Sequence, residues 1–95
     1  MQDFQYTRVL SHGQITDLSG GYRADYPFSI YLRPKEGVEY QDDVLVRCRC
    51  MCDKEMSDLP VAVGDWTTAA IVELAPDAIP LDEYDVYWGA GNTKF

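Results

Sequence analysis

The sequence predicts an all-β protein, a small antiparallel β-sandwich or barrel of about five to seven short strands. Segments in which apolar and polar residues alternate recur at intervals of roughly ten residues. Glycine, proline and aspartate gather between these segments, as they do in turns, and no segment keeps a helical period over about eleven residues. With 95 residues, 46% of them hydrophobic, the chain has the size of one globular domain, residues 1–95.

The N-terminal half contains the first expected strands. Residues 3–10 (DFQYTRVL) alternate in polarity and predict a strand. Residues 14–27 hold two adjacent glycines and a proline, so they predict a connection with at most one short strand. Residues 28–33 (FSIYLR) alternate again and predict a strand, and 34–37 (PKEG) predict the turn that ends it.

The C-terminal half continues the same pattern. A polar segment after the cysteine-rich run predicts a loop or a single helical turn, and a loop flanked by prolines precedes the last strand. The strands expected here are 43–52 (DVLVRCRCMC), one within 59–66 (LPVAVGDW) that stops at the turn dipeptide Gly64-Asp65, 67–75 (TTAAIVELA) and 84–91 (YDVYWGAG).

The three cysteines fall on one face of a predicted strand. Successive strand residues point to opposite faces, so the face shared by alternate residues of VLVRCRCMC is Val44, Val46, Cys48, Cys50 and Cys52. Because free cysteine behaves as a small buried hydrophobe, we interpret this face as part of the core. We expect no metal and no cofactor.

Two alternatives for the cysteines stay open. A zinc site could combine them with His12, the single histidine, but three ligands along one flat strand do not surround a tetrahedral ion. The odd number of cysteines instead leaves a thiol for a disulfide between subunits, and Cys52, beside the polar loop, is the candidate.

The net charge of the chain indicates which classes of partner it can bind. Sixteen acidic residues face eight basic ones, for a net charge of −8, which disfavours direct binding of nucleic acid because phosphate recognition needs a cationic surface. Docking onto a basic protein surface is the functional alternative. No signal peptide and no apolar run of about 20 residues are visible, so we expect synthesis in the cytoplasm and no membrane partner.

The residues do not form a convincing catalytic set. His12 lies between Ser11 and Gly13 in a predicted turn, and neighbours in a turn do not make a nucleophile–base pair. Paired carboxylates such as Asp53 and Glu55 fall in predicted loops, and no glycine-rich segment fits a phosphate-binding template. We therefore expect the protein not to be an enzyme.

The aromatic residues indicate an interaction surface. The chain has twelve, seven of them tyrosine, more than so small a core needs, and tyrosine and tryptophan are favoured at protein interfaces. The predicted interface residues are Tyr84, Tyr87, Trp88 and Phe95, with 89–95 as a C-terminal contact arm. The alternative is a carbohydrate-binding β module in which Trp66, Trp88 and a tyrosine stack on sugar.

The segments Leu59–Val63 (LPVAV) and Thr67–Val72 (TTAAIV) resemble a pattern in small structural proteins of tailed bacteriophage virions. In that pattern a Leu-Pro-Val strand is followed by a threonine-rich turn and an Ile/Val strand. The resemblance implies an all-β virion component without catalytic residues. It implies a capsid decoration protein bound in many copies, or alternatively a neck, tail or spike-base protein, with other virion proteins and further copies of itself as partners.

Overall fold

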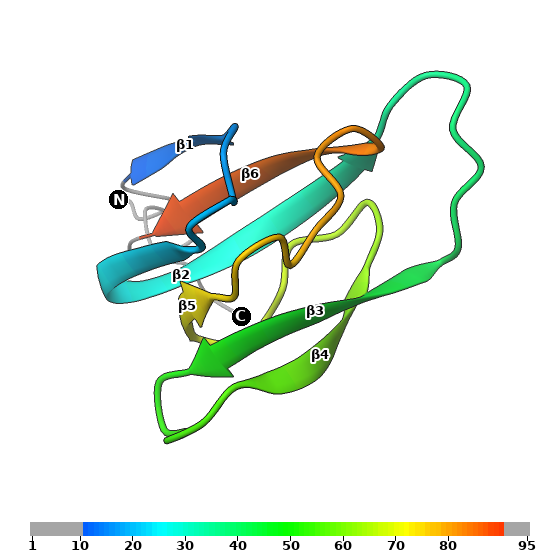
Figure 1. Ribbon diagram of the computed structural model, residues 1–95. Helices are drawn as coiled ribbons and strands as arrows, with labels where there is room; N and C mark the ends of the chain where they lie inside the picture. The colour runs from blue at the N-terminus through cyan, green and yellow to red at the C-terminus, as the bar shows by residue number, and fades with distance from the viewer. Residues whose placement is uncertain (1–10, 91–95) are drawn as a thin grey trace, which may run out of the picture.

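The computed structural model describes residues 11–90 and confirms the all-β prediction (Figure 1). Within that range there are six strands and no helix, and the strands pair antiparallel in one continuous sheet. In chain order they are β1 (Ser11–Ile15), β2 (Tyr22–Pro34), β3 (Asp43–Cys50), β4 (Ser57–Ala62), β5 (Ile71–Leu74) and β6 (Tyr84–Ala90).

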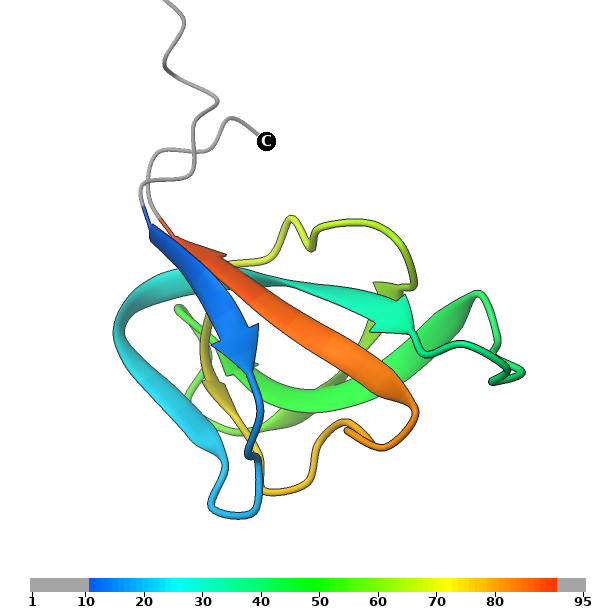
Figure 2. The same cartoon turned by 90° about the horizontal axis from the view of Figure 1, so that it is seen from above.

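Strand β2 joins two layers of the sheet. The strand order is β1-β6-β2-β5-β3-β4, and the second half of β2 pairs with β6 whereas its first half pairs with β5. The register shifts between Arg23 and Phe28, a stretch that contains Pro27, which has no amide hydrogen to donate. The sheet bends there, so that an upper layer of β1, β6 and the second half of β2 lies over a lower layer of β5, β3 and β4 (Figures 1 and 2).

The connection between β4 and β5 closes the sheet back onto β2. The Gly64 N–H donates to the Leu32 carbonyl at 3.0 Å, and the Thr67 N–H donates to the Ile30 carbonyl at 3.0 Å. These bonds occupy the edge of β2 that β6 does not use. The arrangement combines the two layers of a sandwich with the partial closure of a barrel.

The core lies between the two layers. Ile30, Leu32 and Val86 contribute from the upper layer and Val46 and Ile71 from the lower one, all with 0% of their surface exposed. Burial of such aliphatic side chains is the main favourable contribution to folding.

Three segments differ from the sequence prediction. Residues 11–15 and 22–27, expected to be mainly connection, are strand, because β6 and β5 supply ladder partners that local propensity cannot reveal. Residues 67–70, expected to be strand, are loop, because Thr67 is bonded to Ile30 of β2 and the Ala70 carbonyl accepts from Met51, so the segment forms no regular ladder. The predicted strand 3–10 lies outside the described residues.

The described chain begins and ends at one corner of the sheet. Ser11 and Ala90 are cross-strand partners (Figure 2). Of the predicted arm 89–95, Gly89 and Ala90 are buried residues of β6, and the remainder falls outside the described range. Residues 11–90 include no helix that is long and apolar enough to cross a membrane.

Candidate interaction face

Three aromatic side chains, Tyr31, Trp66 and Tyr87, form a cluster on the outside of the upper layer, here called the aromatic face. Tyr31 lies on β2 between two residues with 0% exposure, so strand alternation directs it away from the core. Tyr87 is its cross-strand partner on β6. Trp66 comes from the loop between β4 and β5 and is 41% exposed.

The three rings contact one another in a row. The Tyr31 and Trp66 ring centroids lie 5.4 Å apart with an interplanar angle of 50°. The Tyr31 and Tyr87 centroids lie 6.4 Å apart at 58°. Both distances are within the range of attractive aromatic pairs. The rings therefore support one another and present a tilted, ridged apolar surface rather than a flat one.

Thr67 fixes the position of Trp66. The Thr67 backbone N–H donates to the Ile30 carbonyl, and the Ile30 N–H donates to the Thr67 hydroxyl oxygen, each at 3.0 Å. Thr67 is only 8% exposed, so both bonds are shielded from water. Its two-point attachment to β2 holds the preceding residue, Trp66, beside Tyr31.

Replacing Thr67 by valine is expected to lower the free energy of unfolding by about 1–3 kcal/mol, because the buried Ile30 N–H loses its acceptor. Chemical denaturation of the variant would measure the loss. Thr67→Ser keeps the hydroxyl and should retain most of the stability, while Thr68→Val, at an exposed neighbour, should change it by less than about 0.5 kcal/mol. Equal effects of the valine variants at positions 67 and 68 would contradict this role.

Charged side chains border the aromatic face. The Arg33 guanidinium lies 5.5 Å from the centre of the Tyr87 ring and 2.9 Å from an Asp85 carboxylate oxygen. Lys35 contacts the other Asp85 oxygen at 3.2 Å. The hydrogen bonds from Arg33 and then Lys35 hold the pKa of Asp85 below its usual value, so this carboxylate stays ionised at neutral pH. It orients Arg33 over the edge of the face.

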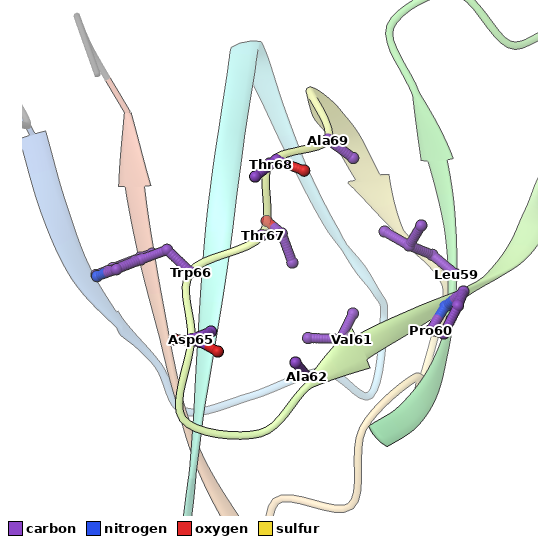
Figure 3. A pocket seen from close by; sticks show the side chains of 9 residues that line it. All are labelled: Leu59, Pro60, Val61, Ala62, Asp65, Trp66, Thr67, Thr68 and Ala69. Atoms are coloured by element: carbon purple, nitrogen blue, oxygen red, sulfur yellow. The ribbon is translucent and has the colours of Figure 1, made fainter. Parts of the chain in front are cut away.

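A surface pocket of about 400 Å³ lies on the other side of the same loop (Figure 3). Figure 3 shows the Trp66 side chain directed away from Leu59 and Val61. The pocket nevertheless adjoins the aromatic face, because Trp66 both lines the pocket and contacts Tyr31. Its lining residues are Leu59, Pro60, Val61, Ala62, Asp65, Trp66, Thr67, Thr68 and Ala69.

The residues predicted to form an interface occupy different environments. Tyr87 belongs to the aromatic face. Tyr84 is 5% exposed and lies in the core, which leaves it little surface for a partner and corrects its assignment to an interface. Trp88 points to the opposite side from Tyr87 and packs against the core under Gly13. Phe95 lies outside the described residues.

The stacking platform considered for Trp66 and Trp88 does not form, because the two indoles lie on opposite faces of the upper layer. Trp66 adjoins Tyr31 on the outer face, whereas Trp88 is a partly buried neighbour of the core. The outward direction of Tyr31 can be predicted from the sequence, because residues on either side of it in β2 are apolar. The position of Trp66 beside Tyr31 cannot be predicted in this way, since it depends on hydrogen bonds between segments that are distant in sequence.

The cysteine face of β3 is buried along most of its length. Val46 and Cys48 have 0% exposure and Cys50 is half-buried, whereas Cys52 follows the end of the strand in an exposed turn. Burial, and then the neighbouring Cys50, raise the pKa of the Cys48 thiol to about 12, so it remains protonated and unreactive near neutral pH. A disulfide between subunits through Cys52 stays a prediction.

His12 lies on β1, not in the turn expected from its neighbours. It is exposed and pairs with Gly89 across the ladder, because tertiary pairing with β6 draws this polar segment into the sheet. Within residues 11–90, no three histidine, cysteine or acidic side chains are placed to hold a metal ion.

No known protein family, curated protein or solved structure matches this chain.

Proposed function

We propose that this protein is a non-enzymatic structural subunit of a bacteriophage particle, a capsid decoration protein that docks onto a neighbouring virion protein through the aromatic face. The observation that carries the docking mode is the row of Trp66, Tyr31 and Tyr87 on the outside of the sheet. The virion setting rests on the resemblance of the segments Leu59–Val63 and Thr67–Val72 to phage structural proteins. A neck, tail or spike-base protein would use the same face.

The exposure of the aromatic face favours a protein partner. Trp66 keeps 41% of its surface exposed although its loop is bonded to β2. A tryptophan held rigidly loses little conformational freedom on binding, and tryptophan, tyrosine and arginine are the residues that most often dominate interface energies. Tyr31 contacts Trp66 directly, and Tyr87 and Arg33 continue the same row beyond Tyr31.

Carbohydrate binding is the second candidate, and the exposed indole of Trp66 is the observation that favours it. A sugar chain stacks best on coplanar rings, whereas Trp66 and Tyr87 are tilted by 50° and 58° against Tyr31. A sugar could therefore use one ring but not the row. Calorimetric titration of the protein with glycans, with Trp66→Ala as the control, separates this candidate from protein docking.

Replacing Trp66 by alanine is expected to weaken binding to the particle about 30-fold or more, because truncation of a tryptophan that dominates an interface typically costs about 2 kcal/mol or more. Phage particles produced from a genome lacking the coding sequence provide the receptor, and the added protein is titrated by co-sedimentation. Tyr40→Ala is the matched control, since Tyr40 is 53% exposed in the connection between β2 and β3, and it should bind as the wild type does.

Two outcomes would count against the proposal in different ways. A virion role would be excluded by two results together. Particles that lack the protein would retain none of it when it is added back, and they would match wild-type particles in heat stability. Binding that Tyr40→Ala weakens as much as Trp66→Ala would keep the virion role but remove the aromatic face as the docking site.

A further inference from the structure

The two ends of the sheet differ in how their outer edges are protected. Strands β1 and β4 are the outermost strands, and within the described residues each has one ladder partner. Strand β4 carries Pro60 and Asp58, and proline and charge are the usual means by which an edge is kept from pairing with another chain. Strand β1 (SHGQI) contains no proline and no acidic or basic residue other than His12.

The charge distribution makes β1 the edge at which two copies of this acidic chain can meet. The net charge of −8 opposes self-association over most of the surface. No carboxylate lies on β1 itself. The side chains of His12 and Gln14 are exposed, whereas Ile15 is 4% exposed and belongs to the core. Two β1 strands can therefore approach without opposing negative charges.

We propose that β1 is a self-association edge through which two copies of the protein pair antiparallel about a two-fold axis at Gly13. In this register Ser11 lies opposite Ile15 of the second copy, and His12 lies opposite Gln14 of the second copy. All five residues of β1 pair, the contact is the same on both sides, and the association closes at two copies.

The geometry of the proposed dimer determines how the two aromatic faces are oriented relative to each other. A two-fold axis that relates antiparallel strands of one sheet stands perpendicular to the sheet, so the outer faces of both copies point the same way. His12 and Gln14 lie on that outer face, since Gln14 is the cross-strand partner of Tyr87. The dimer presents two aromatic faces on one side, which is the arrangement that allows bivalent docking.

The contact between two β1 strands is small, and its area limits the expected affinity of the dimer. A strand of five residues buries less than the roughly 1,200 Å² of a stable interface. The free protein should therefore show a concentration-dependent equilibrium between monomer and dimer. Copies held close together on a scaffold would pair more completely, since tethering raises their effective concentration.

Paired charge substitutions on β1 test the proposal in the full-length chain. His12→Lys/Gln14→Lys places lysine opposite lysine at both pairs of positions 12 and 14 across the contact. His12→Glu/Gln14→Glu places glutamate opposite glutamate at the same pairs. Sedimentation velocity from low micromolar to near-millimolar concentration measures dimerisation. Each double variant should dimerise about tenfold more weakly than the wild type, since like charges directly opposite one another destabilise strand pairing. An equimolar mixture of the two variants should restore the dimer.

Controls separate this edge from other contacts and from misfolding. Ser57→Lys/Ala62→Lys adds the same charge at exposed positions of the β4 edge and should leave dimerisation close to that of a wild-type chain. Trp66→Ala should also leave it unchanged, so that failure of the aromatic face and failure of the β1 contact are distinguishable. Far-ultraviolet circular dichroism verifies that each variant is folded.

Three results would overturn the proposal. A wild-type chain that stays monomeric throughout the concentration range would show that β1 does not pair with a second copy. Weakening by the β4 variant equal to that by the β1 variants would place the contact elsewhere. A mixture of the lysine and glutamate variants that fails to dimerise would exclude the two-fold register at Gly13.

Discussion

Replacement of Phe28 by alanine is expected to lower the free energy of unfolding by about 3–5 kcal/mol, the range measured for truncation of buried aromatic residues. Phe28 is 2% exposed and lies where β2 passes from one layer of the sheet to the other. Its ring meets Tyr22 edge-on, with centroids 5.2 Å apart. Alanine would leave a cavity at this bend, and the stability of small domains is only about 5–15 kcal/mol.

Equilibrium denaturation in urea measures this loss, and the same strand offers a matched control. Tyr26 is an aromatic residue of β2 that is 46% exposed, so Tyr26→Ala should cost less than about 1 kcal/mol. A Phe28→Ala variant that loses no more than Tyr26→Ala would mean that the bend in β2 does not depend on packing around Phe28.

Replacement of Gly21 by alanine should lower the free energy of unfolding by about 2–5 kcal/mol. Gly21 precedes β2 with a φ of 80°, a conformation that glycine adopts freely and that costs other residues because of their Cβ atom. A Cβ atom at this position would also lie 2.7 Å from the backbone oxygen of Leu74. The backbone there cannot move aside easily, because Leu74 is a ladder partner of Tyr22.

The neighbouring glycine is the control for Gly21. A Cβ atom on Gly20 would have no atom within 4 Å, and its φ is not positive in the left-handed range. Gly20→Ala should therefore be neutral or stabilise the protein by up to about 1 kcal/mol, since alanine restricts the unfolded chain. Thermal denaturation of both variants decides the matter, and equal midpoints for the two would contradict the close approach of β2 and β5.

Strand β2 connects the stability of the fold with the proposed docking surface. Its buried residues Ile30 and Leu32 lie in the core, and the carbonyls of the same two residues accept bonds from the loop that carries Trp66. Tyr31, between them, is the central ring of the aromatic face. Substitutions that loosen β2 should therefore disturb binding even where they touch no exposed residue.

Local pattern was enough to predict much of the sheet. Alternating polarity and β-branched residues predicted strands at 28–33, 43–52, 59–64, 67–75 and 84–91, which overlap β2, β3, β4, β5 and β6. The two-residue period of a strand is visible in the sequence wherever one face is buried. The same rule identified the buried cysteine face at Val46 and Cys48. It failed at residues 11–15, where the polar segment SHGQI shows no such period.

The sequence by itself determined the class of the fold, the faces of the strands and an excess of aromatic residues, all of which follow from local periodicity and composition. The tertiary structure alone decided which aromatic residues meet. Tyr84 went into the core and Trp88 under Gly13, whereas Trp66 was brought to Tyr31 by bonds between Thr67 and Ile30. Strand order and register arise from pairing between distant segments, and no local pattern encodes those pairings.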